Sequence, residues 1–208
     1  MPTLTELKTE MERALNDPQL KAEIYARPLR KAGILTTGGR GPSAPHVTER
    51  DCANLLIAIM GDAPAIRGPE TVGLYRPLSL RPRRPGRRGH RSTQPQRVRD
   101  LSGLPLTRIR EVHLFGDLME MLIMWAADGS IERLASVWKR EPNNPGLSLR
   151  LIGPRPGAVL RVPMLDEKLV LAYAGEDQSS PTPSPGVVRA SEIHEDVLIA
   201  LGALFRRS

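Results

Sequence analysis

The chain has 208 residues, 40% of them hydrophobic, and a formal net charge of +7, which suits one large domain or two small ones. Its single cysteine, Cys52, excludes an internal disulfide and a cysteine-based metal site. The acidic, amphipathic N-terminus is unlike a signal peptide, and no apolar run reaches the roughly 20 residues that span a bilayer. We therefore expect a cytoplasmic protein that makes no membrane contact.

The first 78 residues predict a bundle of three or four short helices. Thr3 and Glu6 have the spacing of a capping box, and apolar residues from position 4 to position 15 then follow one helical face. A second helix is expected to begin at Pro18, to kink at Pro28 and to end at Gly33, since glycine suits a left-handed C-cap.

The second half of this bundle begins after a loop rich in Gly and Pro over residues 36–47. Thr48 and Asp51 form another capping box, which predicts a third helix. A fourth short helix is expected around residues 69–78. An oligomerisation or protein-docking bundle would show the same pattern, and that alternative stays open beside DNA binding.

The stretch from Arg76 to Arg110 holds eleven arginines, no lysine and one acid, Asp100, and it accounts for the basic character of the protein. Its high Pro and Gly content, with few apolar residues, predicts a disordered arm over residues 79–110. Arginine binds phosphate bidentately and stays charged at any relevant pH, so we expect this arm to grip nucleic acid. A solvated linker or an arm for an acidic protein partner remains the alternative.

Residues 111–208 show mixed patterns. A helix is expected from Val112 to about Asp128, and a last helix is expected to be capped by Ser191. Strands are expected over residues 131–140, 147–152, 159–162 and 169–173. The last helix has a broad apolar stripe, which predicts a homodimer formed through this part of the chain.

The expected fold class is therefore α+β, in three parts. An N-terminal helical bundle with the outline of a helix-turn-helix module spans residues 1–78, and the Arg-rich disordered arm follows over 79–110. A small antiparallel sheet flanked by helices, for dimerisation or partner binding, makes up 111–208.

The stretch RPLRKAGILTTGGRGPSAPHVTERDCANLLIAI resembles the small helix-turn-helix DNA-binding regulators of prophages and other mobile elements. In those proteins a basic helix that ends in a Lys/Arg-Ala-Gly turn precedes a capped helix. The resemblance implies a DNA-binding transcriptional regulator of bacterial or phage type. The loop over residues 36–47 is longer than the three- or four-residue turn of the standard motif, which leaves open which helix enters the groove.

The residues expected to bind nucleic acid, DNA rather than RNA, are basic and lie on the helices, the Gly-rich loop and the arm. They are Lys21, Arg27, Arg30, Lys31, Arg40, Arg50, Arg81, Arg83, Arg84, Arg87, Arg88 and Arg91. The alternative function is a phage structural, assembly or adaptor protein whose arm contacts nucleic acid or neighbouring subunits.

No catalytic motif is found in the sequence. The Gly-Gly-Arg-Gly loop at 38–41 lacks the Gly-Lys-Ser/Thr of a phosphate-binding loop, and the four histidines lie in separate regions. Cys52 lies on an apolar helical face and is expected to be a buried hydrophobic residue. We therefore expect no enzymatic activity, no metal and no cofactor.

Overall fold

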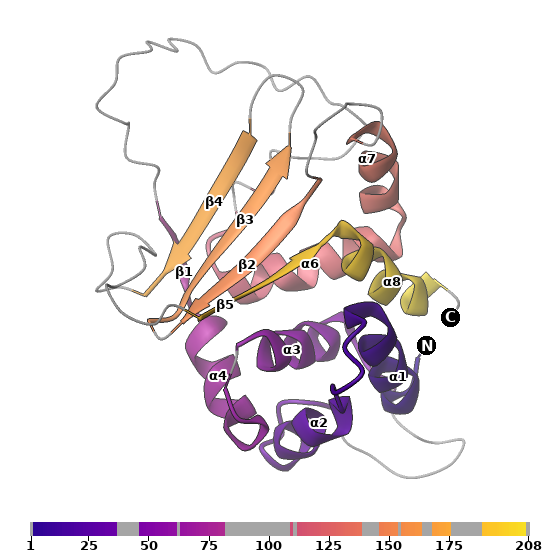
Figure 1. Cartoon of the computed structure of the whole chain (residues 1–208), viewed down its shortest axis with the longest axis vertical. Helices are drawn as coiled ribbons and strands as arrows, with labels where there is room; N and C mark the ends of the chain where they lie inside the picture. The colour runs from indigo at the N-terminus through magenta and orange to yellow at the C-terminus, as the bar shows by residue number, and fades with distance from the viewer. Residues whose placement is uncertain are drawn as a thin grey trace.

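The computed structural model describes residues 2–36, 46–61, 63–81, 109, 112–138, 146–153, 155–163, 168–175 and 189–206. Within these residues the fold is α+β, as the sequence predicts (Figure 1). The helices are α1 (Leu4–Leu15), α2 (Ala22–Lys31), α3 (Glu49–Met60), the 3-10 helix η1 (Ala65–Arg67), α4 (Gly68–Tyr75), α6 (Phe115–Ala127), α7 (Ser130–Trp138) and α8 (Glu195–Arg206). The strands are β1 (Ser79–Arg81), β2 (Ser148–Gly153), β3 (Gly157–Pro163), β4 (Lys168–Ala174) and β5 (Arg189–His194).

Both predicted capping boxes are confirmed, at Thr3 for α1 and at Thr48 for α3. The end of α2 also follows the prediction. Gly33 has a φ of +70°, and the backbone N–H of Ile34 donates to the carbonyl of Leu29 over 2.9 Å, the pattern of a Schellman cap. These ends are correct because each depends only on a few neighbouring residues.

The predicted start of α2 is wrong by one turn. Residues 17–20 form a separate turn closed by the carbonyl of Asp17, and α2 begins at Ala22. The carboxylate of Glu12, from α1, accepts the backbone N–H of Ala22 over 2.8 Å. A side chain from another helix therefore caps α2, which the local sequence could not reveal. Pro28 lies inside this continuous helix.

The strand predicted over residues 131–140 is also wrong, because this segment contains helix α7. Its buried residues, Ile131, Leu134, Ala135 and Trp138, recur at i, i+3, i+4 and i+7, whereas Ser136 is exposed. The indole N–H of Trp138 donates to the carbonyl of Pro163 over 3.1 Å. The buried face of α7 packs against α6 and α8, and the Trp138 hydrogen bond ties the end of the helix to β3.

The five strands form one antiparallel sheet with the order β1-β4-β3-β2-β5. Helix α6 lies behind this sheet in Figure 1. The ring of Phe115, from α6, packs against that of Tyr173, from β4, with 5.7 Å between the ring centroids. The edge strand β1 lies at the start of the predicted arm and pairs with β4. The opposite edge strand, β5, contains Ser191, which was expected to cap the last helix; α8 begins instead at Glu195.

The helices of the first 78 residues pack directly on the rest of the chain. Helix α1 packs against α8 and α3 packs against α6, and their buried side chains belong to one hydrophobic core (Figure 1). The stripe on α8 that predicts a homodimer includes Val197 and Leu201, both buried within this single chain. This stripe is therefore already covered by the protein's own helices.

Among the residues that the structure describes, no helix combines the length and the apolar character that crossing a membrane requires.

Candidate nucleic-acid interface

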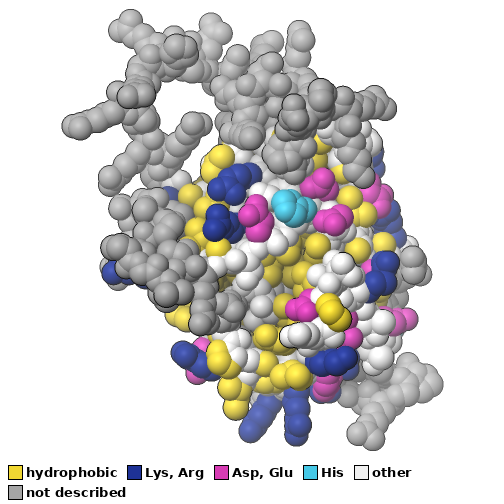
Figure 2. Space-filling view, in the orientation of Figure 1, with side chains coloured by type: hydrophobic (Ala, Val, Ile, Leu, Met, Phe, Trp, Pro, Cys, Tyr) yellow, Lys and Arg dark blue, Asp and Glu magenta, His cyan; other side chains and the backbone are white. Residues whose placement is uncertain are grey.

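The solvent face of α2 is cationic. Lys21, Arg27 and Lys31 are all exposed, and no ion pair joins any of them to another described residue. At 3.6 residues per turn they fall within a sector of about 120°, so they share one broad side of the helix. Figure 2 shows Lys and Arg side chains projecting at the lower end of the molecule, where Figure 1 places α2.

The acid on this helix, Glu23, is already neutralised by its neighbours. Its carboxylate pairs with Lys8 and with Arg30, each over 2.6 Å. The hydrogen bond from Lys8 and the nearby cations, Arg27 among them, lower the pKa of Glu23, so its charge is present at neutral pH and is taken up within the protein. The positive charge of Lys21 and Lys31 is left facing the solvent.

Three of the other arginines predicted to bind nucleic acid interact with residues of the protein itself, some more tightly than others. Arg30 forms the ion pair with Glu23, and Arg81, in β1, donates a hydrogen bond to the carbonyl of Gly175. Arg50 is 68% exposed and lies 3.9 Å from the carboxylate of Glu120, a loose contact that leaves it accessible.

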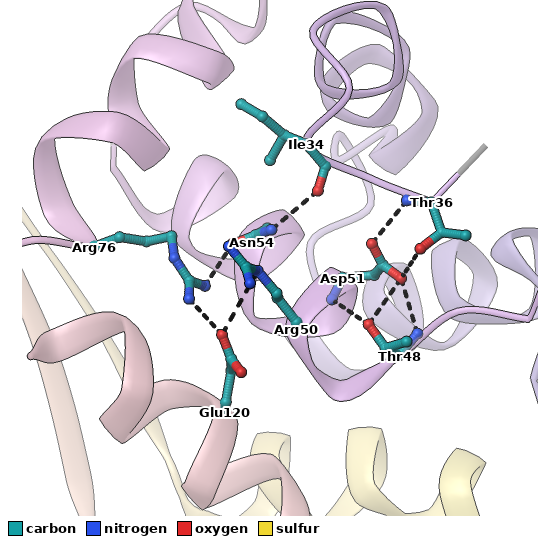
Figure 3. Close-up of polar contacts among 8 residues, drawn as sticks. All are labelled: Ile34, Thr36, Thr48, Arg50, Asp51, Asn54, Arg76 and Glu120. Atoms are coloured by element: carbon teal, nitrogen blue, oxygen red, sulfur yellow. Dashed lines mark hydrogen bonds and ion pairs between the residues drawn. The ribbon is translucent and has the colours of Figure 1, made fainter.

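A buried carboxylate holds the two ends of the segment that links α2 to α3 (Figure 3). Asp51 is 3% exposed, and its oxygens accept the backbone N–H and the hydroxyl of Thr36, over 2.8 and 2.7 Å. The same carboxylate accepts the backbone N–H of Thr48 over 2.8 Å and its hydroxyl over 3.0 Å. The carboxylate therefore ties Thr36, which follows α2, to Thr48, which caps α3.

A second set of polar contacts extends this anchor to α4 and α6 (Figure 3). The side-chain amide of Asn54 donates to the carbonyl of Ile34 over 3.1 Å, and its oxygen accepts from Arg76 over 2.8 Å. The guanidinium of Arg76 also pairs with Glu120. Arg76, the first arginine of the basic stretch, is therefore a structural residue that joins three helices.

Sequence reasoning missed this network, although one signal was present. Asp51 and Asn54 are polar residues separated by i, i+3 on a largely buried helix, and both are buried themselves. Buried polar groups need partners, so this pair already indicated a specific contact. Their partners come from Thr36, Arg76 and Ile34, which the sequence alone does not bring together.

The remaining predicted contacts lie outside the described residues. They are Arg40, Arg83, Arg84, Arg87, Arg88 and Arg91, and the predicted disordered arm lies outside as well apart from Ser79–Arg81 and Ile109.

A further basic group, not predicted from the sequence, lies on the sheet face opposite α6. Arg150 in β2 is paired in register with Val159 and Glu192, and Arg161 in β3 lies 3.7 Å from the carboxylate of Glu192. Figure 2 shows Lys or Arg side chains beside an acidic one on this part of the surface. The nearby acid offsets part of the charge, so this face is less strongly cationic than α2.

The described residues also provide information on a cysteine nucleophile and on a metal site. Cys52 is fully buried, and burial raises the pKa of its thiol far above neutral pH, so the reactive thiolate is not populated. Within the described part of the chain, no group of three His, Cys, Asp or Glu side chains is placed to hold a metal ion.

Comparison with known protein families, with curated proteins and with solved structures finds no match to this chain.

Proposed function

We propose that this protein is a non-enzymatic DNA-binding protein, acting as a transcriptional regulator of bacterial or phage type. The observation that carries the proposal is the solvent face of α2, where Lys21, Arg27 and Lys31 project without an acidic partner among the described residues. The arginines between positions 81 and 110 would add electrostatic affinity that does not depend on base sequence.

Physical reasons favour DNA over an RNA hairpin or a single strand. A helix of ten residues is about 15 Å long, and the major groove of B-DNA, about 12 Å wide, admits one helix. Single-strand binding proteins usually present aromatic platforms, and the two tryptophans here, Trp125 and Trp138, are both buried. A cationic helix at one end of the molecule therefore fits a duplex better.

The rival proposal is an assembly or adaptor protein whose basic residues contact nucleic acid or neighbouring subunits. Such a protein would form rings or larger oligomers and would show little preference among duplexes. The size of the purified protein on an analytical ultracentrifuge, with and without DNA, separates the two proposals.

The direct test is a fluorescence-anisotropy titration of the full chain on duplex DNA from upstream of its own gene, with an excess of nonspecific competitor. We expect binding to survive the competitor and to weaken at least tenfold in the triple variant Lys21→Ala, Arg27→Ala, Lys31→Ala. Each lost phosphate contact weakens attraction to the polyanion, and three are removed together.

The matched control removes the same charge elsewhere. Arg13 and Arg67 are exposed but paired with Glu10 and Glu70, and Arg133 is exposed on α7. Changing all three to Ala should reduce affinity far less than changing the α2 cations. Equal losses would show that only net charge matters and would remove α2 from the interface.

A further inference from the structure

We infer that α2 reads thymine methyl groups in the major groove through Ile24, which would give this helix sequence preference as well as charge. This inference rests on the proposed DNA binding and names the feature of the duplex that the helix recognises.

Ile24 is an apolar side chain in the centre of a cationic helix face. It is 58% exposed, while the buried side of α2 is formed by Ala22, Ala26 and Leu29. Lys21 lies one turn before Ile24 on this face, and Arg27 lies one turn after it. Ile24 does not contribute to the core, and any partner that the flanking cations attract would meet it directly.

The chemistry of this arrangement matches a major groove. Phosphates line both sides of the groove, and they are the groups that Lys21, Arg27 and Lys31 can neutralise. At the floor of the groove, the C5-methyl of thymine is the apolar group that distinguishes a T·A pair, and apolar side chains contact it. A branched aliphatic side chain between cations therefore suits a T-containing site.

An acidic protein segment is the other partner that this face could attract, and the observations favour DNA. Lys21 and Lys31 lie at the two ends of the exposed face of α2, nearly three turns apart, with Arg27 between them. Cations spaced along a helix in this way suit the row of phosphates along a DNA backbone. Ile24 is a single exposed apolar residue within that line, whereas a docked amphipathic helix needs several apolar anchors at i, i+3 and i+4 spacing.

The experiment compares two duplexes that differ only in the thymine methyl. A random-sequence duplex library is selected on the full-length protein, and the enriched duplexes are prepared with thymine or with deoxyuridine, which lacks the methyl. We expect the wild type to bind the thymine form about fourfold more tightly for each methyl contacted, the factor that corresponds to roughly 0.8 kcal/mol per buried methyl-sized group.

Two variants assign the effect to this residue. Ile24→Ala should bind both duplexes alike, at the affinity that the wild type has for the deoxyuridine form. Ile66→Ala is the matched control, because Ile66 is another exposed isoleucine, at 81%, that belongs to η1 and not to α2. This control should keep the full thymine preference. Circular dichroism confirms that both variants are folded.

The possible results separate the two proposals. Equal wild-type binding to thymine and deoxyuridine duplexes overturns the methyl readout and leaves DNA binding standing. A thymine preference that persists in Ile24→Ala also overturns it, since another residue then reads the methyl. Absence of binding to either duplex overturns both proposals. Displacement of the duplex by poly-glutamate at equal charge concentration would reassign the face to an acidic protein partner.

Discussion

At the scale of single residues, the buried carboxylate of Asp51 is a centre of hydrogen bonding. One carboxylate accepts hydrogen bonds from the backbone and side chains of both Thr36 and Thr48, and it lies out of solvent. Loss of an acceptor at such a place leaves buried donors without partners, which costs more than the bonds themselves contribute.

The variant Asp51→Asn should therefore lower the free energy of unfolding by about 1–3 kcal/mol, because an amide nitrogen cannot accept these bonds. The control is Glu49→Gln, a carboxylate in the same helical turn, which should change stability by less than about 0.5 kcal/mol. Urea unfolding at constant m-value measures both. Equal shifts in midpoint would mean that the anchor does not stabilise the fold.

At the scale of elements, helices α6 and α8 approach each other closely at Gly202. A Cβ placed on Gly202 would overlap the backbone and the side chain of Ala126, so the two helices approach as near as a glycine allows. Gly73, in the middle of α4, has open space where a Cβ would be. Packing therefore excludes a side chain at position 202, whereas the described surroundings of position 73 leave room for one.

Their substitution by alanine should have opposite effects. Gly202→Ala is expected to destabilise the protein by about 1–3 kcal/mol, because the packed backbone of α6 must move. Gly73→Ala is expected to stabilise it by about 0.4–1 kcal/mol, because the unfolded chain loses freedom. Thermal unfolding of the pair measures the difference, and a shift of the same sign in both variants would contradict the described packing.

The elements also show which parts of the fold the sequence can predict. The caps of α1 and α3 and the end of α2 were predicted because a few adjacent residues decide each one. The start of α2 was not, because its cap is the distant Glu12, a partner that the local sequence does not name. Helix α7 was mistaken for a strand because the alternation of Leu134, Ser136 and Trp138 was followed, although the apolar residues from Ile131 to Trp138 also have helical spacing.

The candidate site divides in the same way. The basic residues of α2 were named as candidate contacts from residue type alone, and in the structure Lys21, Arg27 and Lys31 are exposed to solvent. The Asp51 and Asn54 network was missed because its partners are brought together only by the packing of α3 against α2 and α6. Arg76 begins the basic stretch in the sequence, and in the structure it belongs to this network.

At the scale of the whole molecule, the sequence predicts a boundary after residue 78, yet α1 packs on α8 and α3 packs on α6 in one core. We expect that fragments 1–81 and 111–208, prepared separately, will each fail to unfold cooperatively in urea. Mixed in equal amounts, they should recover one cooperative transition, because each supplies the surface that the other must bury. Cooperative unfolding of both isolated fragments would contradict a shared core.

The claim that the basic residues bind a polyanion is tested most directly by the salt dependence of DNA affinity. The wild type is compared with the variant in which Arg83, Arg84, Arg87 and Arg88 are changed to Ala, and the logarithm of the association constant is plotted against the logarithm of salt concentration. Each phosphate contact contributes about 0.9 to the slope, so with all four arginines on phosphates the slope should become shallower by up to about 3–4. A slope that is unchanged in the variant would contradict the claim that the arm arginines bind the polyanion.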